Sequence, residues 1–585
     1  MRNHMNGRIG AGLGLMMLAW TGGAGLGGQP NFRVRSDFAA PLNADRGWAG
    51  ALNEDVTIGA DRPFRVRFEV QRPSEASGPR LFRLQYRRNA GAWTDLEAQD
   101  FPKPDAGTPR ASIISCAAYA NGAATIDLLA GLPTGFRPGT GVSLAEGAPT
   151  RTNALGAPDR TAAWAGAGAH GEFEWALVVR RYADGPVTNE EGDTFEFRMV
   201  EADGTLLGAY RNPVLRLAVP PGHVGGTFVE TPGRIGPFQA SNGDLYFIME
   251  PAETNNAFLM ILSTDNGITW REVDAVNRPR TRDLESVDAR LVGDTIHIIH
   301  QVTESARYHT FRTSDHPARP NTWAVRDERA GVVTAVAQMA TLAVRSDGSV
   351  AAFYVGPTKI HYSIRSPAGA WGPVTAIDAD VAPNLAGPQA VLGANDTVHL
   401  AYYGTDGTLW YRRLLPSGAL TAREQLAAGA GTARKHYGSV LPLLYLRETN
   451  TVVILYRLES GTLWERRIVN DGPPTAAVRV TDRAVITNAV DSQQPAADAV
   501  LDGATVHVLF VEESSRSLFS THDRGGWQPA TLQVDNIRGS WVRGSVYTRP
   551  DGVRAYGYVY DAGSEGGAGM NRFGELVLGD TSLRK

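Results

Sequence analysis

A turn followed by a short apolar strand recurs through the second part of the chain. Seven copies of this unit occur between Gly243 and Gly552, so the six intervals average about 52 residues, a length typical of repeated supersecondary units. The turns carry Gly, Asn or Asp, which start strands and hairpins. The pattern therefore predicts a series of repeated antiparallel sheets, and the apolar runs cover residues 245–248, 296–299, 350–354, 398–400, 452–456, 506–510 and 553–560.

A second set of half-apolar runs follows shortly after five of these strands. We interpret these runs as third strands of the same sheets, at residues 308–312, 360–365, 409–413, 463–467 and 518–521. Repeated sheets of this length are typical of β-propeller blades, and ring closure removes exposed sheet edges. The sequence therefore predicts an all-β protein with a six- or seven-bladed β-propeller over residues 225–585, with seven blades favoured.

Residues 31–218 contain alternating apolar and polar runs without this period. Alternation with Gly, Pro and Asp-Gly turns between the runs predicts an antiparallel β-sandwich, immunoglobulin-like or fibronectin-like, with one solvated face on each sheet. Residues 219–224 include Pro220, Pro221 and Gly222 and are predicted to form a linker. The four runs on which this interpretation depends are residues 64–70, 81–86, 174–179 and 194–200.

The first thirty residues are predicted to be a secretory signal peptide. Arg2 and Arg8 give a positive start, an apolar stretch follows, and small residues precede residue 30. We therefore expect a secreted, periplasmic or extracellular protein. Apolar runs long enough for a membrane span are absent from the rest of the sequence, so membrane insertion is not expected.

Composition further limits the classes of ligand and partner that we expect. The formal net charge of -4 gives no basic field for nucleic acid, and Cys116 is the single cysteine, which the apolar sequence around it predicts to be buried. Motifs for zinc, an EF-hand or a nucleotide phosphate are absent from the sequence. We expect a monomer with no cofactor and no metal among its site residues, although a structural calcium ion held by Asp and carbonyl oxygens stays open.

The segment from Ser263 to Trp270 has the pattern Ser-x-Asp-x-Gly-x-Thr-Trp. It resembles the Asp-box of the BNR, or sialidase-like, β-propeller family, and partial matches recur in phase at residues 313–323, 366–371 and 521–527. The resemblance implies that Ser263 and Asp265 bond backbone N–H groups, that Gly267 takes a positive φ, and that Trp270 packs between sheets. These four residues are therefore predicted to be structural.

Polar side chains precede the apolar strands, where the innermost strand of a propeller blade approaches the axial pocket. Arginine clamps carboxylates, glutamine matches hydroxyl groups, and tryptophan stacks on sugar faces. An alternative is that these side chains solvate a channel or bind backbone groups. The candidate substrate-binding residues are Arg234, Arg282, Gln389, Trp541 and Arg543, and the candidate catalytic residues are Glu285, His436 and Tyr437.

The segment Arg234-Ile235-Gly236-Pro237 is similar to the Arg-Ile-Pro motif of sialidases, with Gly236 inserted. The resemblance implies a carboxylate-binding Arg234 and a nucleophilic Tyr437 paired with Glu285, or with Asp283 in its place. Recurrent histidines of the apolar strands are predicted to belong to the scaffold; they are His297, His399 and His507.

The favoured hypothesis is sialidase-like hydrolysis of an acidic glycan at the axial pocket. Two alternatives stay open. A uronate lyase would use His436 as base, Tyr437 as acid, and Arg282 and Arg543 on the carboxylate. A lectin or another glycan-binding or interaction platform would need no central acid pair.

Overall fold

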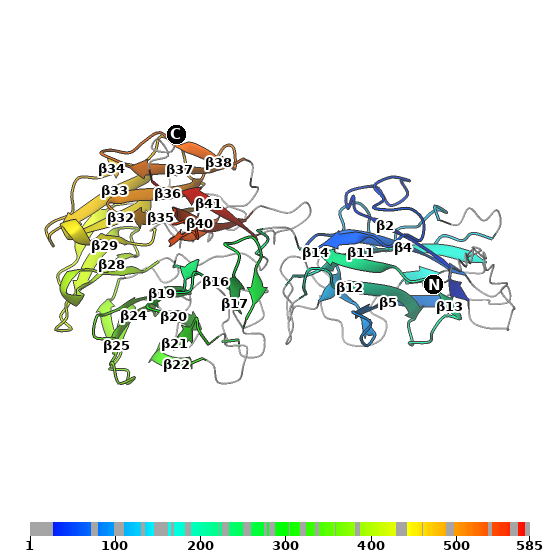
Figure 1. Ribbon diagram of the computed structural model, residues 1–585, viewed down its shortest axis with the longest axis horizontal. Helices are drawn as coiled ribbons and strands as arrows, with labels where there is room; N and C mark the ends of the chain where they lie inside the picture. Colours follow the sequence, from blue (N-terminus) through cyan, green and yellow to red (C-terminus); the bar gives the residue numbers. More distant parts are fainter. Residues whose placement is uncertain are drawn as a thin grey trace, which may run out of the picture.

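The computed structural model describes most of the chain outside the first 26 residues. The described ranges are 27–71, 80–98, 110–129, 135–144, 162–164, 169–181, 189–219, 222–224, 233–249, 259–273, 278–279, 287–302, 305–315, 323–333, 339–356, 359–380, 387–428, 441–458, 460–486, 496–535, 537, 541–561 and 571–579. Residues 1–26 of the predicted signal peptide lie outside these residues, whereas residues 27–30 are described and include the short strand Gly28–Gln29. Figure 1 shows an all-β molecule with two neighbouring bodies.

The first body consists of two six-stranded sheets packed on one apolar core, to which strands of both sheets contribute. One sheet contains β10 (Ala162–Trp164), β5 (Arg80–Arg88), β12 (Thr194–Glu201), β14 (Val214–Ala218) and β3 (Thr57–Gly59), with β6 (Thr94–Asp95) paired to β5. The other contains β2 (Asn31–Arg35), β4 (Phe64–Gln71), β11 (His170–Val179), β8 (Ala111–Ile113) and β7 (Glu97–Ala98), with β9 (Gly141–Val142) paired to β11. A short parallel pair joins β1 (Gly28–Gln29) to β13 (Ala209–Tyr210).

The prediction of one solvated face on each sheet was wrong for the sheet that contains β4 and β11. Arg65 and Arg67 alternate with apolar residues on β4, yet both are fully buried. Glu174 of β11 lies 3.1 Å from Arg65 and 2.9 Å from Arg67. The carbonyls of Ala40 and Leu42 also accept hydrogen bonds from these arginines, because the segment after β2 covers this face. Ion pairing and these carbonyls satisfy charges that would otherwise be costly to bury.

The second body consists of seven successive sheets in the described residues, each an antiparallel meander. The first three sheets are β15 (Phe238–Gln239), β16 (Leu245–Met249), β17 (Leu259–Ser263), β18 (Arg271–Glu272); β19 (Asp288–Val292), β20 (Thr295–Val302), β21 (Ser305–Arg312), β22 (Val325–Val332); and β23 (Ala340–Val344), β24 (Val350–Val355), β25 (Ile360–Arg365), β26 (Thr375–Asp378).

The remaining four sheets follow the same order, and the last has three strands. They are β27 (Gln389–Leu392), β28 (Val398–Tyr403), β29 (Leu409–Leu414), β30 (Glu424–Ala427); β31 (Leu444–Leu446), β32 (Thr451–Arg457), β33 (Leu463–Val469), β34 (Val478–Arg479); β35 (Ala497–Asp502), β36 (Thr505–Val511), β37 (Leu518–Asp523), β38 (Thr531–Val534); and β39 (Val542–Thr548), β40 (Arg554–Asp561), β41 (Asn571–Val577). Two 3-10 turns are η3 (Ala394–Asp396) and η5 (Arg447–Thr449).

The first and last of the seven sheets are in contact. Trp541 and Val559 of the last sheet share a core cluster with Phe247 of the first. The segment 222–224, which precedes the first sheet, hydrogen-bonds to β41 through the Val224 N–H and the Asn571 carbonyl, 2.9 Å apart. Part of the predicted linker therefore adds a backbone partner to the three-stranded last sheet.

The octet from Ser263 to Trp270 forms a closed turn after β17. The Ser263 hydroxyl accepts the Gly267 N–H at 2.8 Å, and Asp265 Oδ1 accepts the Thr269 N–H at 2.8 Å. Gly267 has a φ of +85°, and a Cβ there would lie 2.2 Å from the ring of Phe573, so the position requires glycine. The Trp270 ring packs between Phe247 and Phe573, which belong to the first and last sheets.

The two bodies also meet at this turn. Arg181, directly after β11, donates a side-chain hydrogen bond to the Trp270 carbonyl. Asp61 accepts the Arg181 N–H at 3.0 Å and lies 2.9 Å from the ring nitrogen of His223. These groups are buried and connect the two-sheet body to the chain segment that pairs with β41.

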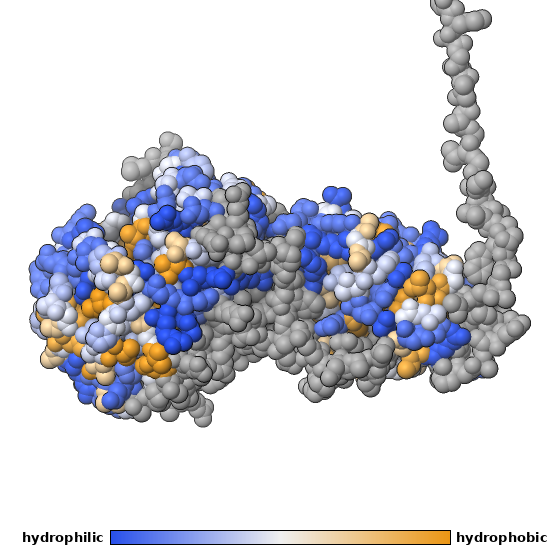
Figure 2. All heavy atoms as spheres, turned by 90° about the horizontal axis from the view of Figure 1, so that it is seen from below, coloured by the Kyte–Doolittle hydropathy of each residue, from blue (hydrophilic) through white to orange (hydrophobic). Residues whose placement is uncertain are grey.

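The surface in Figure 2 is largely hydrophilic, with apolar residues in small patches. In the described part of the chain, we find no helix with the length and apolar character needed to cross a membrane.

We expect Asp265→Ala to lower the free energy of unfolding by about 1–3 kcal/mol, because the Thr269 N–H and the Ser263 and Thr269 hydroxyls lose a charged acceptor. Urea unfolding measures the change. Asp482→Ala is the control, since the Asp482 side chain is 99% exposed. An equal effect of both substitutions would contradict a structural role for the Asp265 carboxylate.

A second prediction concerns acid stability. Burial lowers the pKa of His297, His399 and His507 from 6.5 to about 4. Folding therefore favours the neutral rings, and stability falls as the pH drops from about 6.5 towards 4. We expect His399→Gln to reduce this fall when urea unfolding is measured across the interval. An unchanged pH dependence in the variant would show that His399 does not contribute.

Candidate functional site

The first strand of each sheet, which we call the inner strand, carries a residue at an equivalent position of the repeat. Each of these residues pairs with the same position of the second strand in its own sheet, so the repeat makes them equivalent. In the sheets where both partners are described within strands, they are Asp288, Thr341, Gln389, Asp498 and Gly544, opposite Ile299, Phe353, Ala401, Leu509 and Tyr558.

Asp288 connects three neighbouring sheets. Its Oδ1 accepts the backbone N–H of Arg234, which precedes the first sheet, at 2.8 Å. Its Oδ2 accepts the hydroxyl of Thr341 in the third sheet at 2.7 Å. The Thr341 hydroxyl in turn accepts the Ala390 N–H of the fourth sheet at 3.2 Å. The side chains of Asp288 and Thr341 therefore bond the next sheet rather than pointing to solvent.

Asp498 has the corresponding role between the sixth and seventh sheets. Its Oδ2 accepts the Gly544 N–H at 2.7 Å and the Tyr556 hydroxyl at 2.8 Å. Burial, followed by the charge of Asp498, raises the pKa of Tyr556 well above its ordinary value. Tyr556 therefore acts as a hydrogen-bond donor to this carboxylate over the physiological pH range.

Arg543 is fully buried beside Asp498. It donates to the Ala497 carbonyl at 2.6 Å and to the Val542 carbonyl at 3.1 Å. Burial lowers the pKa of its guanidinium to about 10, so the group stays charged at neutral pH. The positive charge lies 3.9 Å from Asp498 Oδ1 and offsets the buried carboxylate.

Arg234 precedes the first sheet, and its side chain contacts the sixth and seventh sheets. Its guanidinium donates to the Gly544 carbonyl at 3.0 Å and to the Ala499 carbonyl at 2.7 Å. Arg290 of the second sheet similarly donates to the Ala390 carbonyl of the fourth sheet at 3.0 Å. Both arginines therefore bind backbone carbonyls of other inner strands.

The structure brings together two of the predicted carboxylate ligands, Arg234 and Arg543, around Asp498. Their described contacts are scaffold contacts, as in the alternative in which these side chains bind backbone groups. Gln389 is buried, and Trp541 is fully enclosed in the core shared by the first and last sheets, so its ring offers no free face for a sugar. The other four predicted residues lie outside the described residues, and their roles stay predictions: Arg282, Glu285, His436 and Tyr437.

A cluster between the second and third sheets was not singled out from the sequence. Glu328 of β22 accepts a two-pronged pair of hydrogen bonds from Arg365 of β25, at 2.7 and 3.1 Å. The Trp371 indole donates to the same carboxylate, and Arg365 lies 5.2 Å from the ring centre of Tyr308. The hydrogen bond to Glu328 raises the pKa of Arg365. The arginine and carboxylate side chains are 15% and 28% exposed, so solvent reaches this cluster.

A similar cluster lies between the third and fourth sheets. Arg423 donates to both oxygens of Asp380, at 2.7 and 2.8 Å, and its guanidinium lies 4.2 Å from the ring centre of Trp410. Trp410 and Tyr308 occur in the third-strand runs that repeat along the sequence. That repetition was the available signal. It does not identify the partner carboxylates, because Glu328 lies in the same sheet as Tyr308, whereas Asp380 follows the sheet that precedes Trp410.

Both clusters combine the groups that bind sugars elsewhere in proteins. A carboxylate accepts from sugar hydroxyls, a guanidinium donates to them, and an aromatic ring contacts the apolar face of the sugar. Within the described ranges, no group of three or more His, Cys, Asp or Glu side chains is placed to hold a metal ion.

We expect Arg234→Ala to lower the free energy of unfolding by about 2–4 kcal/mol, because two carbonyls lose a charged donor. Arg312→Ala is the control, since Arg312 is exposed. Urea unfolding measures both variants. A stability loss no larger than that of the control would contradict a scaffold role for Arg234.

Comparisons with known proteins do not assign the chain to a family. Neither a protein-family model nor a curated protein matches it. Among solved structures, it is similar to the BP39L lectin of Burkholderia pseudomallei, with 12% identity and a TM-score of 0.43, over 60% of this chain and 100% of that one.

Two further structures have comparable similarity. One is the Aleuria aurantia lectin, described as a six-bladed β-propeller that recognises fucose, with 12% identity and a TM-score of 0.35, over 54% of this chain and 98% of that one. The other is a puromycin-hydrolysing peptidase of Mycobacterium tuberculosis, with 14% identity and a TM-score of 0.35, over 60% of this chain and 56% of that one. At these TM-scores, the similarities carry no argument about activity.

Proposed function

We propose that this protein is a carbohydrate-binding β-propeller whose glycan sites lie between neighbouring blades. The observation that carries the proposal is the recurrence of an arginine–carboxylate pair beside an aromatic ring at two successive sheet junctions. Arg365 with Glu328 forms the first pair, and Arg423 with Asp380 forms the second. Both clusters are partly exposed, so a sugar can exchange its hydroxyl groups for water at the pair.

The proposal includes closure of the seven sheets into a seven-bladed ring. Three contacts support closure: the core shared by the first and last sheets, the pairing of segment 222–224 with β41, and the reach of Arg234 to the sixth and seventh sheets. In such a ring, each junction between blades is bounded by two sheets, which gives every site a fixed geometry.

The contacts of Arg234 and Arg543 support binding without hydrolysis. Arg234 and Arg543 hold backbone carbonyls and a buried carboxylate, which leaves the acidic-sugar pocket without two of its three expected cationic ligands. Sialidase-like hydrolysis and uronate elimination stay hypotheses that depend on Glu285, His436 and Tyr437.

The test is isothermal titration of the full-length protein with neutral and acidic oligosaccharides. We expect the wild type to bind saturably and Arg423→Gln to bind at fewer sites. A variant that carries both Arg423→Gln and Arg365→Gln should lose at least tenfold in affinity at both junctions, because each sugar loses charge-assisted hydrogen bonds. Unfolding curves must stay close to those of the wild type.

Arg312→Gln is the matched control, since it removes an exposed propeller arginine outside both clusters. Unchanged binding in the double variant would reject the junction sites. Steady release of free sugar by the wild type, abolished in Tyr437→Phe, would replace the binding proposal with hydrolysis.

A further inference from the structure

The first and last of the seven sheets meet at a contact that we call the seam. The Trp270 ring fills it, with its centre 5.1 Å from the Phe247 ring of the first sheet and 5.4 Å from the Phe573 ring of the last. Segment 222–224 crosses the seam: the Gly222 N–H donates to a carbonyl of the turn before Trp270 at 2.7 Å, and the Gly222 carbonyl accepts the Phe573 N–H at 2.8 Å. The seam therefore contains one buried ring and one bridging backbone segment.

The two-sheet body contacts the first-sheet side of the seam through Arg181, which follows β11 and is buried. The Arg181 guanidinium donates to the Trp270 carbonyl, to the Asn189 carbonyl and, at 2.9 Å, to the Glu190 carboxylate. Asn189 and Glu190 belong to the same body as Arg181, so this body itself orients the guanidinium. Arg181 thus fixes the backbone of the residue whose ring fills the seam.

The same body contacts the last-sheet side of the seam through Asp61. The Asp61 N–H donates to the carbonyl of Val179, the last residue of β11, at 2.8 Å, and the carboxylate accepts the Arg181 N–H at 3.0 Å. The carboxylate also lies 2.9 Å from Nε2 of His223, which donates to it because an ionised carboxylate only accepts. The backbone of His223 forms an antiparallel bridge with Arg572 of β41. One carboxylate therefore connects the end of β11 to the segment that pairs with the last strand.

These contacts between the two bodies are directional hydrogen bonds. Among the described residues, the apolar core of the two-sheet body shares no member with the apolar cluster at the seam. Arg181, Asp61 and His223 are nevertheless buried, and a buried polar group that loses a hydrogen bond costs more free energy than an exposed one. Domains of one chain move relative to each other unless their interface resists it, and here buried hydrogen bonds supply that resistance.

We propose that the two-sheet body is a clasp that holds the seam closed. Arg181 holds the first-sheet side through the Trp270 backbone, and Asp61 holds the last-sheet side through His223. Both residues are anchored at the end of β11, so the two sides of the seam cannot separate while this body stays docked. The clasp does not rest on the proposed glycan sites. It gives the two-sheet body a partner surface within its own chain.

The experiment measures hydrogen–deuterium exchange of the full-length protein by mass spectrometry in Arg181→Met and His223→Phe. Each substitution keeps much of the side-chain volume and removes one contact with the seam. We expect each variant to exchange about tenfold faster both in β41 and in residues 259–273, because opening of the seam exposes both sides together. Exchange in β24 and β25 of the third sheet should stay unchanged.

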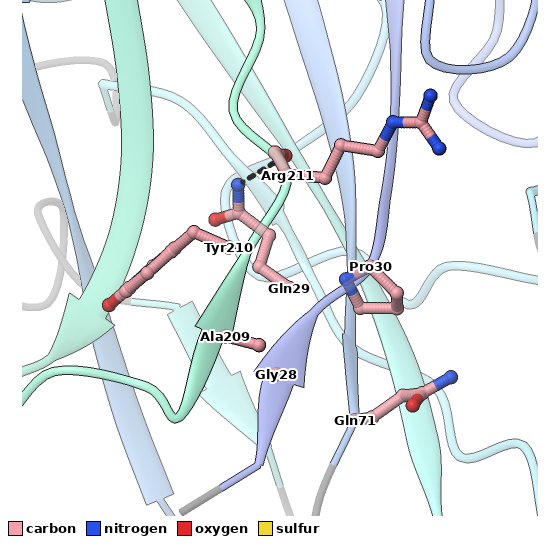
Figure 3. Close-up of a pocket in the computed structure, with 7 residues that line it drawn as sticks. All are labelled: Gly28, Gln29, Pro30, Gln71, Ala209, Tyr210 and Arg211. Atoms are coloured by element: carbon pink, nitrogen blue, oxygen red, sulfur yellow. Dashed lines mark hydrogen bonds between the residues drawn. The ribbon is translucent and has the colours of Figure 1, made fainter. Parts of the chain in front are cut away.

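Arg211→Gln is the matched control, because Arg211 is an exposed arginine of the same body. It follows β13, which lies at the end of this body away from the seven sheets (Figure 1). Figure 3 shows the Arg211 guanidinium extending away from Gln29, whose amide bonds the Arg211 carbonyl. The control should leave exchange unchanged at the seam.

The decisive result is the effect of each variant on the side of the seam that it does not touch. Faster exchange of residues 259–273 alone in Arg181→Met, with β41 unchanged, would overturn the clasp, since the two contacts would then act separately. Faster exchange of β41 alone in His223→Phe would overturn it in the same way. An equal rise in β24 and β25 would also overturn it, because the contacts would then support all of the sheets rather than the seam.

Discussion

Buried carboxylates between neighbouring inner strands are the interaction on which the arrangement of the seven sheets depends. Asp288 bonds a backbone N–H before the first sheet and a hydroxyl in the third, and Asp498 bonds a backbone N–H in the seventh. Each of these hydrogen bonds fixes the position of one sheet relative to its neighbour. Removing a carboxylate would leave buried donors without an acceptor, which costs more than the loss of an exposed contact. Arg234 and Arg543 each lie 3.9 Å from Asp498 Oδ1, close enough to offset the negative charge of this carboxylate.

The repeated sheets could be predicted because their signals are local. Turn residues and apolar strands recur within each unit, and the turn from Ser263 to Trp270 closes through bonds between residues four positions apart. The burial of Arg65 and Arg67 could not be predicted in this way. Their alternation with apolar residues matches a solvated sheet face, and only the segment around Leu42, folded over that face, turns them into buried groups.

The residues that precede the strands of the repeat show the same limit. Their positions led us to predict Arg234 and Arg543 as ligands at an axial pocket, but the partners of Arg234 are carbonyls 265 and 310 residues further along the chain. A backbone carbonyl has no sequence signature. The junction clusters depend on pairings of intermediate sequence separation, and Asp380 and Arg423 are 43 positions apart. Sequence reasoning therefore identified these residues and kept binding to backbone groups as an alternative, but it could not identify the carbonyls that they bind.

The pairing of segment 222–224 with β41 also sets an order for biosynthesis. The segment leaves the ribosome hundreds of residues before its partner strand is made. The two-sheet body can fold as a unit while translation continues, since domains generally fold from the N-terminus onwards. The edge formed by β39 and β40 must wait for the C-terminal strand and for the segment that was translated hundreds of residues earlier. A nascent chain that stalls before residue 571 would thus carry six complete sheets, while β40 and segment 222–224 would both lack their partner β41.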